Sequence, residues 1–211
     1  VKKNAAILVL FAVCLLLGHS AWGDVITLHP SDVASSGGFS TAGGVWPDIL
    51  DSNDGDSGYA SFCCSASGQM FYVDMDDPSG PAGQTIASVR VYAYAKYVAG
   101  PWPNPAPYSG NTAIGFKTGV STIWSPNTLT DTSGDYNFIS SGLFTTDSDG
   151  GGLDIADLEN LQIAVLRNAS GSAQLRVTEL YAEIEYTPVP GTIALLWCGA
   201  FALARRRKKA C

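Results

Sequence analysis

The feature that most constrains the fold is a series of short segments in which apolar, β-branched and aromatic residues alternate with polar ones. In Leu175–Tyr186, the even positions from 180 to 186 are Leu, Ala, Ile and Tyr, whereas Glu183 and Glu185 fall between them. A period of two is typical of a strand with one buried and one solvated face. Five segments are rich in these residues: Gln69–Met75, Ile86–Val98, Thr112–Thr118, Leu161–Arg167 and Leu175–Tyr186.

Shorter apolar segments lie between these five, separated by clusters of Gly, Pro, Ser and Asp that are typical of turns. A helical pattern occurs in Leu153–Leu161, where Asp154 is a suitable N-cap. Many short strands joined by turns predict an all-β fold, an antiparallel β-sandwich of the jelly-roll type. The weaker strand candidates are Val25–Leu28, Val45–Leu50, Tyr59–Phe62, Ser121–Trp124, Tyr136–Ile139 and Leu143–Thr145.

The first 23 residues have the pattern of a secretory signal peptide. Lys2 and Lys3 precede the apolar stretch Ala5–Leu17, and Ala21 and Gly23 place small residues at the two positions that signal peptidase reads. Signal peptidase is therefore expected to cleave after Gly23 and to leave Asp24 as the first residue. The predicted organisation is a signal peptide over 1–23, a β-sandwich domain over 24–187 and a C-terminal tail over 188–211.

The tail combines an apolar run, Thr192–Ala204, with five consecutive basic residues. Such a basic block is held on the cytoplasmic side while the apolar part enters lipid, so we expect a transmembrane helix with a stop-transfer end. Thirteen helical residues span about 20 Å, short of the ~30 Å hydrocarbon core, which favours a temporary anchor over a permanent one. The stop-transfer residues are Arg205, Arg206, Arg207, Lys208 and Lys209.

The order of a Pro-containing motif, an apolar helix and an Arg-rich end resembles the bacterial PEP-CTERM sorting signal. The motif positions are Val189, Pro190, Gly191 and Thr192, where that family usually has Val-Pro-Glu-Pro. The resemblance covers the tail alone. It implies a bacterial exported protein that is processed by a membrane-embedded exosortase-type enzyme and delivered to the cell surface or beyond. An ordinary C-terminal transmembrane anchor is the alternative.

Charge excludes one class of partner. Residues 24–187 hold five basic and all 19 acidic residues, a formal charge of −14. Such a domain repels the phosphates of nucleic acids, so nucleic acid is not an expected partner.

The sequence also offers few groups for catalysis. His29 is the one histidine after Gly23, and the adjacent Cys63 and Cys64 do not supply a disulfide framework or a zinc site. Glu179, Glu183 and Glu185 are interpreted as solvent-facing strand residues and not as a glycosidase pair. We therefore expect no enzyme.

Calcium is the expected metal. Asp51, Asn53, Asp54 and Asp56 bring four oxygen-bearing side chains together, with Gly55 allowing a sharp turn. This donor set suits a hard cation with six to eight ligands. A second Asp-rich group, Asp147, Asp149, Asp154 and Asp157, is a weaker candidate. Asp and Gly are also common turn residues, which is the alternative for both groups.

Aromatic residues suggest a second kind of binding. The proline-rich segment Ala99–Gly110 contains Trp102 and Tyr108, and a stiff loop could hold such rings against a sugar. Folding of the Trp102 ring back over the end of the sandwich is the alternative. Trp46 and Trp124 lie in or beside strands and are expected in the core.

A second resemblance covers most of the central region. The Asp-rich stretch Asp51–Ser61, the strand Thr85–Val91 and the closing Val177–Tyr186 resemble β-sandwich units of bacterial surface and phage structural proteins, akin to galactose-binding-like modules. The resemblance implies a binding or scaffolding module. Two functions follow as hypotheses: a non-catalytic exported surface or extracellular-matrix protein, and a calcium-dependent module that binds extracellular polysaccharide.

Overall fold

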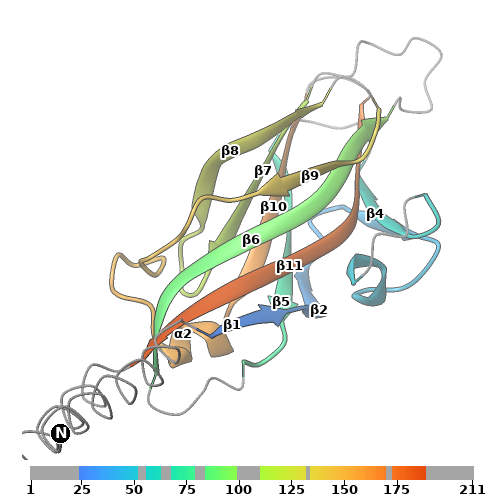
Figure 1. Cartoon of the computed structure of the whole chain (residues 1–211). Helices are drawn as coiled ribbons and strands as arrows, with labels where there is room; N and C mark the ends of the chain where they lie inside the picture. Colours follow the sequence, from blue (N-terminus) through green and yellow to red (C-terminus); the bar gives the residue numbers. More distant parts are fainter. Residues whose placement is uncertain are drawn as a thin grey trace, which may run out of the picture.

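A computed structural model of the chain describes residues 24–51, 56–62, 68–78, 84–98, 110–131, 134–169 and 173–188. These residues form two antiparallel sheets packed face to face, with the six-stranded sheet in front in Figure 1. That sheet has the order β3-β4-β11-β6-β9, and β1 also pairs with β11. Its strands are β1 (Val25–Leu28), β3 (Ser40–Ala42), β4 (Tyr59–Phe62), β6 (Gln84–Val98), β9 (Asn137–Ser140) and β11 (Gln174–Pro188).

The five-stranded sheet lies behind it, in the order β2-β5-β10-β7-β8. From β4 onward the chain fills the two sheets as β4-β11-β6-β9 and β5-β10-β7-β8, which is the strand order of a jelly roll. The predicted antiparallel sandwich of this type is confirmed. The strands of this second sheet are β2 (Pro30–Ser35), β5 (Gln69–Met75), β7 (Gly110–Lys117), β8 (Ile123–Asp131) and β10 (Gln162–Ala169).

Alternation along the strands fills the space between the sheets. On β11 the even positions from Leu180 to Tyr186 are fully buried, as the sequence pattern predicts. The inward residues of β5 and β10 meet them from the other sheet, among them Phe71 and Ile163, which are also fully buried. The core is therefore one apolar cluster between the sheets, and Arg167 of β10 is also fully buried.

The short helix α2 (Ile155–Glu159) closes one end of the sandwich (Figure 1). The Asp154 side chain accepts from the Asp157 backbone N–H at 3.0 Å, and the Asp157 carboxylate accepts from the Asp154 N–H at 2.8 Å. This reciprocal capping box confirms Asp154 as the N-cap. Leu158 anchors the helix in the core.

Two strand predictions are wrong. Val45–Leu50 forms a turn and the 3₁₀ helix η1 (Asp48–Leu50), which buries Ile49 and Leu50 side by side and not on alternate sides. Leu143–Thr145 makes only an isolated bridge, between Phe144 and Val89. The strands β2 and β3 were not predicted.

No helix within the described residues is long and apolar enough to cross a membrane. The predicted signal peptide, the sorting motif Val189–Thr192 and the stop-transfer block lie outside the described residues. Cys63 and Cys64 also lie outside them.

Candidate functional site

One row of side chains crosses the outer face of the five-stranded sheet. Tyr72 on β5 pairs with Ala164 on β10, Ala164 pairs with Gly115 on β7, and Gly115 pairs with Trp124 on β8. The residues on either side of Tyr72, Ala164 and Gly115 along their own strands are fully buried in the core. Because side chains alternate along a strand, the row itself points away from the core.

The ring of Tyr72 lies down across this face. Its hydroxyl is 3.2 Å from Oγ1 of Thr122, the residue immediately before β8, so the side chain extends over β10 toward β7. The hydroxyl also approaches Sδ of Met70 at 2.9 Å. Ala164 points outward and is nevertheless 0% exposed, as expected if the ring covers it. The small Ala164 side chain leaves room for the Tyr72 side chain, which is half-buried.

Trp124 lies at the other end of this row, on the edge strand β8. A Cβ on Gly115 would fall 2.4 Å from the carbonyl oxygen of Ile123 and 3.0 Å from Cε3 of Trp124. Only glycine allows β8 and the indole to come this close to β7. Trp124 is half-buried over the outer side of Gly115, so its prediction as a core residue is wrong, whereas Trp46 does pack against the core. We call Tyr72 and Trp124, with Ala164 and Gly115 beneath, the Tyr72 platform.

A polar hollow of about 470 Å³ adjoins the Tyr72 platform. Its lining includes Asp74, Gln162 and Lys117, which occupy the next outward row on β5, β10 and β7. The Gln162 side chain donates from Nε2 to the Asp74 carboxylate at 2.8 Å. Lys117 lines the polar hollow and also contacts the Tyr72 platform, because its ammonium lies 5.4 Å from the centre of the Tyr72 ring. The face thus offers an aromatic surface beside polar groups.

The outer face of the six-stranded sheet carries aromatic residues in a different arrangement. Tyr92 and Tyr181 stack with ring centres 4.7 Å apart, and Phe138 stacks on Tyr92 at 5.4 Å. His29 continues this row, the aromatic ladder, at 6.5 Å from Tyr181. The inner rings of the ladder, Tyr92 and Tyr181, stack on each other, and the two end residues are exposed, Phe138 at 52% and the His29 side chain at 46%. This face therefore offers mainly ring edges to a ligand.

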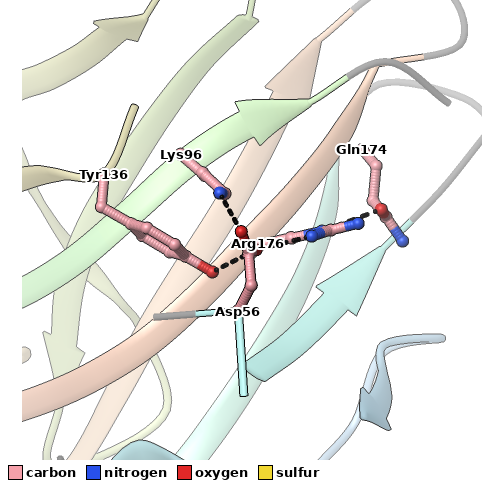
Figure 2. Close-up of polar contacts among 5 residues, drawn as sticks. All are labelled: Asp56, Lys96, Tyr136, Gln174 and Arg176. Carbon is pink, nitrogen blue, oxygen red and sulfur yellow. Dashed lines mark hydrogen bonds and ion pairs between the residues drawn. The ribbon is translucent and has the colours of Figure 1, made fainter. Parts of the chain in front are cut away.

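A polar cluster lies on the same sheet near its other end (Figure 2). The Asp56 carboxylate accepts from Lys96 Nζ on β6 at 2.9 Å and from Arg176 Nη1 on β11 at 2.7 Å. The Tyr136 hydroxyl donates to it at 3.4 Å, and Gln174 accepts from Arg176 Nε at 3.1 Å. The Asp56 cluster therefore ties the turn before β4 to the two central strands.

Charge and burial shift two pKa values in the Asp56 cluster. The hydrogen bond from Lys96 lowers the pKa of Asp56, and that from Arg176 adds to this effect. Burial raises the pKa of Tyr136 well above its usual value, and the negative charge of Asp56 acts in the same direction. At neutral pH the carboxylate is therefore ionised and the phenol neutral.

The structure describes only part of the predicted calcium loop. Asn53 and Asp54 lie outside the described residues, whereas Asp56 pairs with the two cations. Asp51 pairs through its backbone with Glu179, and its carboxylate is 3.8 Å from Nδ1 of His29. The structure therefore does not test whether these four side chains bind one calcium ion.

The second Asp-rich group serves local structure. Asp147 accepts from the N–H groups of Asp149 and Gly151, and Asp154 and Asp157 form the helix cap. Over the described segments, no three His, Cys, Asp or Glu side chains are grouped as metal ligands.

The predicted sugar contacts Trp102 and Tyr108 lie outside the described residues. Sequence reasoning missed Tyr72, although the signal was present: an aromatic residue on the polar side of the alternation in Gln69–Met75, and a glycine inside the strand Gly110–Lys117.

No protein-family model matches the chain, and no curated protein matches it. Among solved structures it is similar to the xylan-binding module CBM15, with 14% identity and a TM-score of 0.40 over 79% of this chain and 98% of that chain. It is also similar to TmCBM61 in complex with beta-1,4-galactotriose, with 10% identity and a TM-score of 0.37 over 75% and 86%. A Family 16 Carbohydrate Binding Module-2 has 12% identity and a TM-score of 0.36 over 69% and 84%. Likeness at this level does not assign a ligand to this chain.

Proposed function

We propose that this chain is a non-catalytic carbohydrate-binding module of an exported bacterial protein, with its site on the outer face of the five-stranded sheet. The observation that carries the proposal is the outward row in which Tyr72 reaches across the sheet to Thr122 and Trp124 lies against Gly115. A sugar ring has an apolar face of C–H groups and an equatorial rim of hydroxyls. The first suits an aromatic ring that lies parallel to the sheet, and the second suits the polar groups beside it.

The comparison between the two sheets supports this choice of face. In the aromatic ladder, stacking between neighbouring rings occupies the surfaces that a sugar would need. At the Tyr72 platform, Ala164 is fully buried, the Tyr72 side chain is half-buried, and the flexible Lys117 side chain places its ammonium over the ring. Lys117, Gln162 and Asp74 lie close by to hydrogen-bond with hydroxyls.

Export and anchoring are part of the same proposal, supported by the basic and apolar pattern at both termini. A module held at the envelope, or released after processing at Val189–Thr192, would act in the extracellular polysaccharide layer. Replacing the five residues Arg205–Lys209 by Ser should let the chain pass through the membrane and accumulate unanchored. Deleting residues 188–191 should instead block processing and retain a full-length membrane-held form. A wild-type chain that stays membrane-bound at full length in a bacterial host would support the plain anchor.

The binding proposal is tested by screening the purified protein on a glycan array and measuring the best ligand by isothermal titration calorimetry. Tyr72→Ala should weaken binding about tenfold or more, which corresponds to about 1.4 kcal/mol. Tyr72→Phe keeps the ring and loses only the contacts of the hydroxyl with Thr122 and Met70, so it should retain most of the affinity.

Phe138→Ala is the matched control. It removes an exposed aromatic ring from the opposite sheet and should leave the affinity unchanged. Circular dichroism and the melting temperature of each variant show whether it is folded. Absence of binding to every glycan, or loss of binding in Phe138→Ala and not in Tyr72→Ala, would contradict the proposal.

A further inference from the structure

The polar hollow beside the Tyr72 platform has an unusual balance of charge. Four carboxylates from three different parts of the fold line it, and the cation among its lining residues is Lys117. That ammonium lies at the Tyr72 ring, on the side of the hollow that adjoins the platform. The carboxylates are those of Asp32, Asp74, Asp77 and Glu159.

The neutral groups of the hollow are used mainly as donors within the protein. Gln162 donates from Nε2 to Asp74, and Asn160 donates from Nδ2 to the carbonyl oxygen of Ala156 at 3.1 Å. The hydroxyl of Ser31 donates to the backbone oxygen of Asp74 at 3.2 Å. Because the side-chain nitrogens of Gln162 and Asn160 donate to protein groups, their side-chain oxygens are left as acceptors. The hollow is therefore rich in acceptors and poor in donors.

This balance favours some glycans over others. A carboxylate or sulfate on the ligand would be repelled by the four acids and would find few donors. Neutral hydroxyls can donate to the acceptors of the hollow. A protonated amine supplies both three donors and the opposite charge, so it matches best. The formal charge of −14 on residues 24–187 acts in the same direction at longer range.

We propose that the polar hollow selects glycans that carry free primary amines over their N-acetylated and neutral counterparts, and that it excludes uronate-containing and sulfated glycans. This inference rests on the proposed function, because the Tyr72 platform supplies the stacking surface that holds the sugar chain beside the hollow. The carboxylates of the hollow then determine which substituents on the bound glycan are favoured and which are repelled.

The test uses four oligosaccharides of equal length with the full chain: a β-1,4-linked glucosamine hexamer, its N-acetylated form, cellohexaose and a galacturonate hexamer. Titration calorimetry is run at a pH where both carboxylates and amines are charged. The glucosamine hexamer should bind about tenfold or more tightly than the acetylated form, and galacturonate should not bind. Raising the ionic strength should reduce the difference in affinity between the glucosamine hexamer and its acetylated form, because part of that difference is electrostatic.

Two variants with the same change in charge separate the hollow from the rest of the acidic surface. Glu159→Gln removes a charge from the hollow, and Asp48→Asn removes an exposed charge at the first residue of η1. Glu159→Gln should reduce the preference for the amine about threefold, the effect of one charge at about 6 Å in water. Asp48→Asn should leave it unchanged.

The outcomes distinguish this inference from the proposed function. If cellohexaose or the acetylated hexamer binds as tightly as the amine, or if galacturonate binds better, the inference is wrong while carbohydrate binding stands. Equal effects of Glu159→Gln and Asp48→Asn would also overturn it, because the preference would then come from overall charge. If none of the sugars binds and the array is empty, the proposed function fails as well.

Discussion

The Asp56 cluster offers the sharpest test of how this sandwich is held together. Asp56→Asn keeps the shape of the side chain but removes the negative charge that faces Lys96 and Arg176. The Lys96 side chain is only 9% exposed, and its ammonium lies 4.2 Å from the ring centre of Tyr136. The substitution therefore leaves a nearly buried cation with a neutral amide as its partner.

The size of the effect follows from burial and distance. A hydrogen bond to a charged group contributes about 1.5–3 kcal/mol, and Asp56 makes two within 2.9 Å. Solvent screens the carboxylate, whose side chain is 59% exposed, so the pair contributes less than the sum of two such bonds. We expect a loss of about 2 kcal/mol in the free energy of unfolding. For a domain of this size that corresponds to a fall of about 4–8 °C in melting temperature.

The contribution of Asp56 to stability depends on pH in a direction that can be measured. The pKa of Asp56 is lower in the folded state than the ordinary value of 3.8, so its contribution is fully present above that value and is lost as the pH falls through the lowered pKa. The difference in stability between wild type and Asp56→Asn should be constant from neutral pH down to mildly acidic pH. It should shrink only in strong acid.

Urea unfolding, followed by circular dichroism, measures these differences. Lys96→Met provides a double-mutant cycle, because it removes the cation while keeping an apolar stem of similar length. The double variant should lose less stability than the two single losses added together. A loss of less than about 0.5 kcal/mol in Asp56→Asn at neutral pH, or purely additive effects, would refute the reasoning.

Four further expectations concern other parts of the chain. Gly115→Val should lower stability by about 1–3 kcal/mol and weaken glycan binding, because its side chain would displace β8 and the indole; unfolding and titration measure the two effects. Asp154→Ala should cost about 1 kcal/mol through loss of the helix cap, again seen in urea unfolding. Calcium should raise the melting temperature of the wild type and not of Asp51→Ala with Asp54→Ala, and an equal response in both would exclude this loop as the site. Mass spectrometry of exported protein should find Asp24 as the first residue, whereas an uncleaved N-terminus would contradict the predicted signal peptide.

The sequence was sufficient to predict a strand where that strand has one buried and one solvated face. Gln69–Met75 was predicted with the observed ends, and the buried side of β11 followed from alternation alone. β2 was missed because Pro30–Ser35 is a polar edge strand with two register shifts, so little of it needs to be apolar. The strand prediction for Val45–Leu50 was wrong because its apolar residues are buried by a turn and a 3₁₀ helix, which place Ile49 and Leu50 in the core without sheet pairing.

The site could not be predicted to the same extent. That Tyr72 faces outward follows from the alternation, but its position over Ala164 depends on the register between β5 and β10, which are far apart in the sequence. The role of Asp56 was also hidden, because Lys96 and Arg176 come from different strands and an Asp-rich turn predicts calcium as readily as an ion pair. Local patterns fix which face a residue occupies, whereas long-range pairing decides its neighbours.

The position of β11 has a consequence for the order of folding. This strand, the last of the sandwich along the chain, pairs with β1, β4 and β6, so it occupies the centre of its sheet. Until residues 174–188 have been synthesised, β3–β4 and β6–β9 are two separate strand pairs with no shared neighbour. Contacts between such distant segments form slowly, because a long loop must close before they add stability. The six-stranded sheet can therefore be completed only after its last strand has been made, and a chain that ends before residue 174 lacks the strand that joins the two pairs.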